Sequence, residues 1–136
     1  MSDDYLEMLR KIVGPEGIFV SEAEMNPYLQ EQRGFYEGHC NAVVRPGSTK
    51  EVAEVVSYCQ ESGISITPQS GNTGLCGGAV PSGGILVNMG RMNKIRNLDK
   101  INSTITAESG CVLVDLQKAA RQEELLMTLS CPSEKE

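Results

Sequence analysis

The sequence contains few aromatic side chains and one histidine. Tryptophan is absent, aromatic residues make up 4% of the 136 residues, and His39 is the single histidine. Bases of single-stranded nucleic acids stack on aromatic side chains, and cationic ligands sit in aromatic cages, so this composition argues against both ligand classes. A net charge of -6, from 18 acidic and 12 basic residues, also argues against a surface that binds nucleic-acid phosphates.

Long hydrophobic runs and close metal-ligand spacings are missing as well. No apolar stretch approaches the roughly 18 residues that span a bilayer. The acidic segment Met1–Asp4 lacks the basic and apolar regions of a secretory signal. Five cysteines without a C-x-x-C pair predict no metal site. An odd cysteine count without a signal predicts reduced thiols in a cytoplasmic protein, with Cys59 acting as a buried apolar residue.

The first third of the chain predicts one clear helix and one strand. Apolar residues at helical spacing predict a helix over Tyr5–Val13, preceded by Ser2 as a cap and ended by Gly14-Pro15. Residues 21–41 show no strong period, so we expect a loop with one short helical turn. The apolar run Ala42–Val44 then predicts a buried strand.

The next segment predicts a strand, a crossover helix and a second strand. Ser48 and Glu51 have the spacing of a capping box, and Gly63 stands where a left-handed C-cap belongs. The β-branched run Ile64–Thr67 follows as a strand. These elements predict a parallel, right-handed βαβ unit.

Further strands and a helix are predicted in the last third. Strands are expected at Ile85–Asn88, Lys94–Leu98 and Thr104–Ala107, and a helix is expected after Gly110 with Leu113, Leu116, Ala119 and Ala120 on one face. The apolar Leu125–Met127 is followed by the polar Cys131–Glu136 and has nothing after it to pack against. The chain therefore looks cut short, and we expect this end to self-associate or to be poorly ordered.

A glycine-rich stretch at Pro68–Gly78 carries the strongest functional indication. Glycines let backbone N–H groups converge without Cβ obstruction, which suits a phosphate or pyrophosphate. The stretch has no lysine, so it is not a P-loop, and its G-x-x-G-x-x-G-G spacing differs from the dinucleotide fingerprint. Composition alone leaves two alternatives open, an anion site and a turn that serves only geometry.

Three segments together resemble a known flavoprotein family. They are Arg45–Val52, Pro68–Gly78 and Asn88–Ile95. In this order they resemble successive motifs of the FAD-linked oxidases, the vanillyl-alcohol-oxidase-type flavoproteins with a PCMH-type FAD-binding domain. The similarity is greatest to the branch of D-2-hydroxy-acid dehydrogenases, which includes enzymes that oxidise D-lactate, D-2-hydroxyglutarate and glycolate. It covers about residues 40–130.

The resemblance implies a non-covalent FAD site in this stretch. In the family the loop wraps the FAD pyrophosphate through backbone amides, and a proline after the first strand lies near the adenine. The implied FAD contacts here are Pro46, Pro68, Ser70, Gly71, Asn72, Thr73, Gly74, Gly77 and Gly78. Ser70 replaces a usual glycine, at a cost of about 1 kcal/mol or more if the backbone requires a positive φ. Members with covalent FAD have a histidine where this chain has Asn72, and an amide cannot form that bond. Cysteinyl attachment through Cys76, which replaces a usually small or β-branched residue, is the weaker alternative.

The resemblance also implies the fold, the domain limits and the function. The expected fold is α+β, the first subdomain of a PCMH-type FAD-binding domain, with a short parallel βαβ core and flanking helices. We expect an N-terminal helix and loop extension at 1–40, the first FAD-binding subdomain at 41–130 and a truncated tail at 131–136.

The implied function is the FAD-binding part of a flavin-dependent oxidoreductase that oxidises a D-2-hydroxy acid to the 2-oxo acid. A second FAD-binding subdomain and a substrate domain are expected after residue 136, so this chain is expected to be inactive by itself. The alternative from another class is a non-catalytic module for nucleotide or anion binding, or for association.

Other polar residues are expected to have simpler roles, and no catalytic residue is named. His39 is expected in a loop, Arg91 and Lys94 in a solvated turn, and Asp115 as an exposed charge on the last helix. Arg45 follows a predicted strand, which leaves a role beside the cofactor and a surface ion pair equally open.

Overall fold

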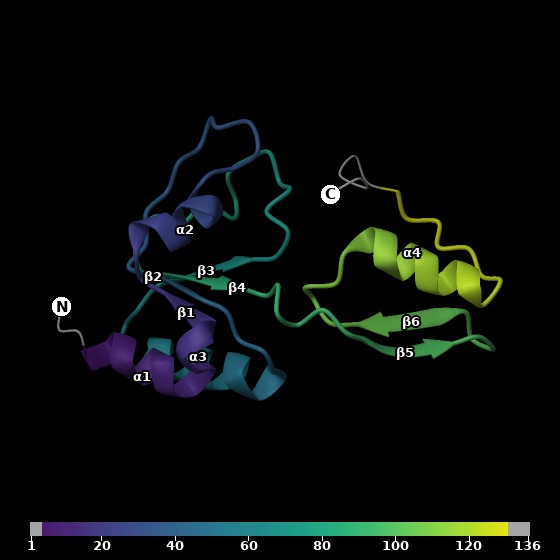
Figure 1. Cartoon of the computed structure of the whole chain (residues 1–136), viewed down its shortest axis with the longest axis horizontal. Helices are drawn as coiled ribbons and strands as arrows, with labels where there is room; N and C mark the ends of the chain where they lie inside the picture. Colours follow the sequence, from purple (N-terminus) through teal and green to yellow (C-terminus); the bar gives the residue numbers. More distant parts are fainter. Residues whose placement is uncertain (1–3, 131–136) are drawn as a thin grey trace. The chain divides into compact units, whose positions relative to one another are not determined.

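The structure is a computed structural model that describes residues 4–130 (Figure 1). The chain forms two compact units, Met1–Arg91 and Met92–Glu136. Helices and strands occur in both units, which confirms the predicted α+β class. Among residues 4–130, no helix has both the length and the apolar character needed to cross a membrane.

The first unit is built on a four-stranded sheet in the order β1-β2-β4-β3. Its strands are β1 (Ile18–Phe19), β2 (Ala42–Val44), β3 (Ile66–Gln69) and β4 (Ile85–Asn88). The strands β2 and β3 both pair in parallel with β4, whereas β1 pairs antiparallel with β2. Helices α1 (Asp4–Val13) and α3 (Thr49–Glu61) cover one face, and α2 (Glu22–Leu29) lies on the other (Figure 1).

The two strands of the predicted βαβ unit are parallel, as expected, and a further strand lies between them. The strands on either side of α3 are parallel, but β4 lies between them and pairs with both. The pairing joins Val43 to Leu86 and Thr67 to Leu86. Short apolar runs do not encode which strand takes the central position, so the sequence made no prediction of the strand order.

Helix α3 begins and ends as its local sequence predicts. The Ser48 Oγ accepts a hydrogen bond from the Glu51 amide at 3.2 Å, and the Glu51 carboxylate accepts one from the Gly47 amide at 2.8 Å. At the other end Gly63 has a φ of 66°, and the Ile64 amide donates to the Cys59 carbonyl at 2.8 Å. This is a Schellman C-cap. Because Ile64 belongs to the cap, strand β3 begins at Ile66 rather than at Ile64 as predicted.

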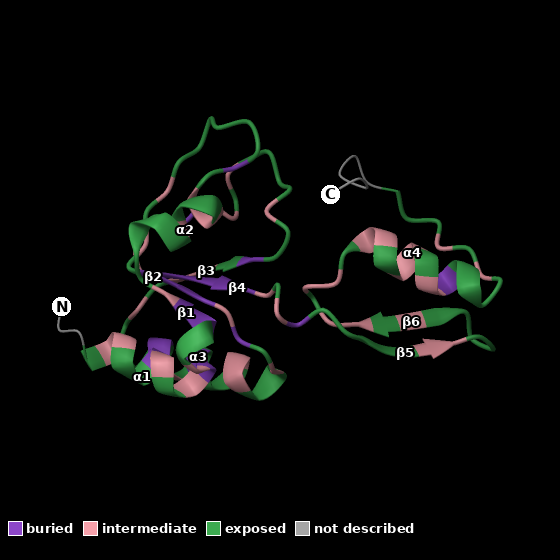
Figure 2. Cartoon of the chain, in the orientation of Figure 1, coloured by how far each residue is buried: buried purple, intermediate pink, exposed green. Residues whose placement is uncertain are grey.

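The core of the first unit lies on both faces of the sheet (Figure 2). On the α1 and α3 face, the buried side chains include Leu9, Val44, Val55, Cys59 and Ile85. On the other face Val43 and Leu86 are also fully buried. Burial on both faces explains why the parallel strands are continuous apolar runs without polar alternation. The expectation that Cys59 is a small apolar core residue is confirmed.

The segment before β2 is more ordered than predicted. Residues 22–29 form helix α2 despite Pro27, where a loop with one helical turn was expected. Ser21 and Glu24 have capping-box spacing, and the Ser21 hydroxyl donates to the Glu24 carboxylate. Residues 18–19 also form an unpredicted strand. The compact units divide after Arg91, and α1 and β1 pack into the first unit. The expected domain limits at 1–40, 41–130 and 131–136 stay a prediction.

The second unit is an antiparallel hairpin with one helix. Strands β5 (Ile95–Asp99) and β6 (Thr104–Ala107) pair with each other, and α4 (Leu113–Gln122) contacts β6. These elements agree with the predictions to within a residue or two. The Asp99 carboxylate closes the hairpin turn by accepting bonds from the amides of Ile101 and Asn102 at 2.9 and 3.0 Å. The expected cap Ser2 and the expected tail 131–136 lie outside the described residues.

Candidate functional site

The glycine-rich loop leaves the sheet at the carboxyl end of β3. This strand ends at Gln69, opposite Asn88 at the end of the parallel strand β4. The end of β2, followed by Arg45 and Pro46, lies at the same edge because β2 is parallel to β4. In open parallel sheets, ligands bind outside the carboxyl ends of the strands. The loop, Ser70–Gly78, therefore starts where such a fold places its ligands.

A buried pair of amide side chains holds the base of the loop. Gln69 and Asn88 are both buried. Asn88 Nδ2 donates to Gln69 Oε1 and to the Ser70 carbonyl, each at 3.1 Å. Gln69 Nε2 donates to the carbonyls of Tyr28 and Ala79 at 2.9 and 3.1 Å. The pair thus joins both ends of the loop to the sheet and to the last turn of α2.

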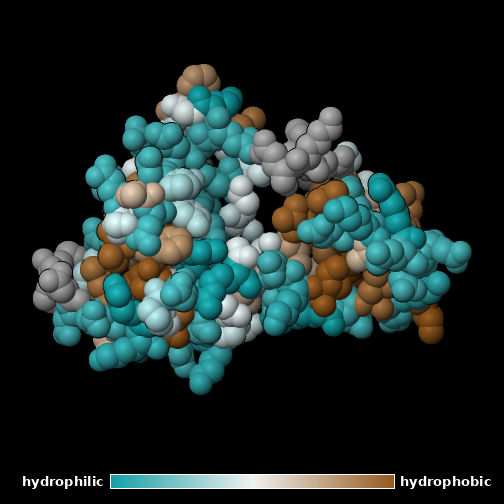
Figure 3. Space-filling view, in the orientation of Figure 1, coloured by the Kyte–Doolittle hydropathy of each residue, from teal (hydrophilic) through white to brown (hydrophobic). Residues whose placement is uncertain are grey.

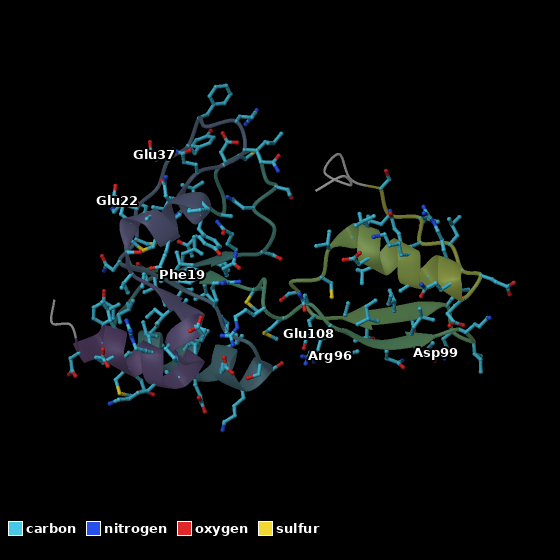
Figure 4. All side chains as sticks on the ribbon, viewed as in Figure 1. Phe19, Glu22, Glu37, Arg96, Asp99 and Glu108 are labelled. Carbon is cyan, nitrogen blue, oxygen red and sulfur yellow. The ribbon has the colours of Figure 1, made fainter. Side chains whose placement is uncertain are left out.

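A second segment, residues 30–38, runs beside the loop, and we call it the bracing turn. A bridge between Gln30 and Glu37 closes it, and Glu37 marks its place in Figure 4. Asn72 Nδ2 donates to the Gln30 carbonyl at 2.6 Å, and Arg33 Nη2 donates to the Leu75 carbonyl. The bracing turn therefore contacts the loop from residue 72 to residue 77, where the Tyr36 ring meets Gly77.

Glu31 is the buried anchor of the bracing turn. Its side chain has 0% exposure, and its two oxygens accept hydrogen bonds from the amides of Arg33 and Phe35 at 2.8 and 2.7 Å. The Arg33 guanidinium lies 3.7 Å from Glu31 Oε2. The Arg33 amide is the main cause that lowers the pKa of Glu31 below its ordinary value. Glu31 is therefore held as a carboxylate.

The glycines of the loop fall into two kinds. Gly77 has a φ of 73°, and an added Cβ would lie 2.8 Å from the Tyr36 ring, so the chain itself requires glycine there. Gly74 and Gly78 have no positive φ, and an added Cβ would meet nothing within 4 Å. At Gly71 the nearest atom would be a Thr73 methyl at 3.7 Å. These three positions leave open space along the loop.

The backbone amides of the loop from Gly71 onward are also free of hydrogen bonds within the described residues. Within residues 4–130, the amides from Gly71 to Ala79 donate no hydrogen bond to another group of the chain. Four of these nine residues are glycines, and free N–H groups at and beside glycines match the chemistry of a phosphate or pyrophosphate. The residues present therefore fit the pyrophosphate group of FAD.

The other implied contacts lie after β2, at the end of β3 and in the first half of the loop. Pro46 is fully buried after β2, and Pro68 is exposed within β3. Ser70 has no positive φ, so the conformational cost considered for a serine at this position does not arise. Asn72 has a φ of 51°, a conformation that asparagine tolerates better than most residues. Thr73 is exposed.

Four residues that support the loop were missed in the sequence analysis. They are Gln69 and Asn88 at its base and Glu31 and Arg33 in the bracing turn. Gln69 and Asn88 had a detectable signal, because each is a polar residue at the end of an apolar strand. Glu31 and Arg33 had none, since the loop partner of Arg33 lies 42 positions along the sequence and Glu31 acts on the loop only through Arg33.

The remaining candidates have varied outcomes. Arg91 is not in a solvated turn as predicted: Arg91 Nη1 donates to the carbonyls of Val13 and Arg45 at 3.2 and 2.7 Å. Lys94 and His39 are exposed. Asp115 is exposed and pairs with Lys118 at 3.2 Å. The Arg45 guanidinium stacks 5.1 Å from the centre of the Phe19 ring, a contact not anticipated from the sequence.

Comparison with curated proteins reveals clear relatives. A probable mitochondrial D-2-hydroxyglutarate dehydrogenase of Oryza sativa subsp. indica is 32% identical over 130 residues, covering 95% of this chain and 23% of the relative. A D-lactate dehydrogenase of Anaerostipes hadrus is 35% identical over 124 residues, covering 88% of this chain and 26% of the relative. The chain spans about a quarter of the length of these relatives.

Solved structures and a family model agree with these relatives. p-Cresol methylhydroxylase has a TM-score of 0.83 at 22% identity over 97% of this chain and 27% of its own, which shows the fold. A 4-ethylphenol oxidase from Gulosibacter chungangensis has a TM-score of 0.75 at 26% identity over 89% of this chain and 24% of its own. The family model described as "FAD binding domain" matches residues 40–135. The resemblance found in the sequence is therefore confirmed, and the chain belongs to the FAD binding domain family.

Proposed function

We propose that this chain is the FAD-binding part of a flavin-dependent oxidoreductase that oxidises a D-2-hydroxy acid to the 2-oxo acid. The relatives named above act on D-2-hydroxyglutarate and D-lactate according to their names, which supports this substrate class. When bound, FAD supplies the two-electron acceptor for the hydride that leaves the substrate's α-carbon. The present residues bind and orient it.

The observation that carries the proposal is the open row of amides from Gly71 to Gly78 at the carboxyl end of the sheet. Within this site, the loop amides would hold the pyrophosphate, with Ser70, Gly71, Asn72, Thr73, Gly74, Gly77 and Gly78 as the contacts and Pro46 and Pro68 beside them. The loop contains no lysine or arginine. Its contribution to binding therefore comes from oriented N–H groups rather than from formal charge.

Two glycine substitutions test the site. Gly74→Ala and Gly78→Ala add a methyl group in open space, so stability should stay unchanged while FAD affinity falls at least roughly tenfold. Gly63→Ala is the matched control, because its φ of 66° makes alanine strained at a position in the C-cap of α3. It should lower the melting temperature and leave FAD affinity as it is.

Titration of the chain with FAD and with inorganic pyrophosphate distinguishes a flavoenzyme part from a non-catalytic anion-binding module. We expect the wild-type chain to bind FAD weakly, because the loop offers mainly pyrophosphate contacts. Inorganic pyrophosphate that binds clearly more tightly than FAD would favour the alternative, a non-catalytic anion-binding module. Equal FAD affinity in wild type, Gly74→Ala and Gly78→Ala would overturn the loop as the site. Flavin retained through dialysis would mean that more of this chain contacts it.

Non-covalent attachment is a separate part of the proposal. Asn72 occupies the position of the histidine that carries flavin in covalent members, and its amide nitrogen is not nucleophilic. Cys76 is exposed and is the other conceivable attachment point. Acid precipitation of the holoenzyme should leave all flavin in the supernatant. A yellow pellet, or a peptide with flavin mass at Cys76, would contradict this.

Self-association through the C-terminal apolar residues is proposed as well. Leu126 is 78% exposed. Together with Leu125 and Met127 it lines a cavity of about 200 Å³. Hydrophobic residues gather on the surface of the second unit, which contains these residues (Figure 3). We expect the chain to sediment as a dimer and Leu126→Glu to shift it to the monomer. A monomeric wild type with a protease-resistant C-terminus would contradict this.

A cytoplasmic location stays a prediction. The cysteines in the described residues, Cys40, Cys59, Cys76 and Cys111, are all unpaired thiols, in line with a reducing compartment. Some relatives are mitochondrial by name. Cell fractionation of the tagged protein tests the location, and recovery in the mitochondrial fraction would contradict it.

A further inference from the structure

The glycine-rich loop receives its order from groups outside itself. Its own amides make no hydrogen bonds within residues 4–130 from Gly71 to Ala79, as described above. Side chains hold it instead, with the Gln69 and Asn88 pair at its base and the bracing turn along its length. A ligand that binds to oriented amides needs those amides in place beforehand, because ordering them on binding costs free energy.

Arg33 is the side chain that reaches the middle of the loop. Its Nη2 donates to the carbonyl of Leu75, halfway between the base contacts at Ser70 and Ala79. The guanidinium also lies 5.0 Å from the centre of the Phe35 ring and 3.7 Å from the Glu31 carboxylate. A planar guanidinium with several donors can keep such contacts at the same time. Glu31 and Phe35 therefore hold the Arg33 guanidinium in place, and its Nη2 binds the loop at the Leu75 carbonyl.

The Glu31 side chain is an anion, and its carboxylate holds the Arg33 guanidinium in place. Each of its oxygens faces a backbone amide, and no part of the side chain is exposed. A glutamine there would turn its NH₂ group toward one of these N–H groups and lose that bond. The buried carboxylate thus sets both the shape of the bracing turn and the position of the guanidinium.

We propose that Arg33, anchored by Glu31, is a positioning residue that holds the glycine-rich loop in its FAD-binding conformation. This inference rests on the proposed function for its ligand, but the hold on the loop is independent of it. The contact at Leu75 and the contact of Asn72 with Gln30 fix the segment between them. Gly74, one of the positions with open space for a ligand, lies within that segment.

Nuclear magnetic resonance of the 136-residue chain tests the hold without any ligand. In the wild type, backbone order parameters from Gly71 to Gly78 should be near 0.85, the value of a rigid backbone, and in Arg33→Met they should fall below about 0.6. Arg33→Lys keeps one donor and should restore part of the order. Arg10→Met is the matched control, since Arg10 is 41% exposed against 44% for Arg33 and pairs with Glu7 on α1.

Stability and FAD affinity complete the test. The melting temperature of Arg33→Met should stay close to that of Arg10→Met, because neither side chain is in the core. FAD affinity should fall roughly tenfold in Arg33→Met and Glu31→Gln, and not in Arg10→Met. A loop equally ordered in Arg33→Met and wild type, or already mobile in the wild type, would overturn the positioning role. An ordered wild-type loop that Arg33→Met mobilises, with no FAD binding in any variant, would support the positioning role and contradict the proposed function.

Discussion

The two units of this chain differ in how they bury apolar side chains. The first unit places helices on both faces of a parallel sheet, and residues such as Leu9, Val43 and Leu86 are wholly excluded from solvent. Among the described residues of the second unit, only Met92 and Ala120 are buried (Figure 2). Since hydrophobic stabilisation scales with the apolar area removed from water, the first unit should be much the more stable of the two.

The same difference appears in the sites that the two units carry. The first unit supports an exposed loop through a buried amide pair and a buried carboxylate. The second unit has one partly open cavity between its hairpin and the end of its helix, lined mainly by apolar residues including Leu98, Ile105 and Leu126. A well-packed core can hold an irregular loop in place, whereas a thin layer leaves apolar residues uncovered.

The largest expected effect comes from truncating one leucine in each unit. Leu9→Ala in α1 should lower the free energy of unfolding by about 2 to 5 kcal/mol, because its side chain is fully buried. Leu98→Ala, beside the cavity, should cost about 1 kcal/mol, because this leucine is half-buried. Native-state hydrogen exchange measures the free energy of unfolding of each unit separately. Equal losses at both sites would contradict the difference in packing.

Removing the helix cap of the first unit and adding one in the second should change their stabilities in opposite directions. Helix α3 has the Ser48 cap, so Ser48→Ala should destabilise the first unit by about 1 kcal/mol. Helix α4 begins after Val112, whose side chain makes no capping bond. Val112→Ser should therefore stabilise the second unit by about 0.5 to 1 kcal/mol. Exchange rates of the amides in each helix measure this, and a destabilising Val112→Ser would show that the Val112 methyl groups matter more than the cap.

Acid should weaken both units, because the fold lowers the pKa of Glu31 in the first unit and of Glu108 and Asp99 in the second. Hydrogen bonds from the amides of Arg33 and Lys94 are the main causes that lower the pKa of Glu31 and of Glu108 below 4.5. Glu108 also pairs with Arg96 at 3.2 Å (Figure 4). A carboxylate with a lowered folded pKa stabilises the fold above its unfolded pKa, and this contribution disappears as the pH falls through the folded pKa.

Thermal melts below pH 4.5 should therefore show declining stability, and Glu31→Gln should reduce that decline in the first unit only. Glu108→Gln should do the same in the second unit. Variants that are less stable than wild type at pH 7 and approach it as the pH falls through the lowered folded pKa fit this mechanism. An unchanged pH profile in both variants would contradict it.

The smallest expected effects come from exposed ion pairs on the helices. Lys50 pairs with Glu54 on α3 at 3.7 Å, and Lys118 pairs with Asp115 on α4 at 3.2 Å. Lys50→Ala and Lys118→Ala should each change the free energy of unfolding by less than about 0.5 kcal/mol, because water and salt screen such pairs. Denaturation in low and high salt measures this. A larger loss on α4 alone would mean that surface charge supports the thinner unit.

The sequence predicted well where structure depends on near neighbours. The capping box at Ser48 and the C-cap glycine Gly63 identified both ends of α3. The strand Thr104–Ala107 was predicted with its observed limits. Helix α2 was missed because residues 21–41 lack a strong period and contain Pro27, and the capping-box spacing of Ser21 and Glu24 was not used. The loop was found because glycines at close spacing are rare, and because three motifs resembled one family.

What the sequence by itself determined is the set of local elements, the apolar runs that would become buried strands, and the loop at Ser70–Gly78. Only the tertiary structure decided that β4 lies between β2 and β3, that Arg91 caps carbonyls 46 and 78 positions away, and that the bracing turn holds the loop across 42 positions. The physical reason is the range of the interactions. Caps and periodicity act within a few residues, whereas strand order and these hydrogen bonds depend on distant segments that meet only when the core packs.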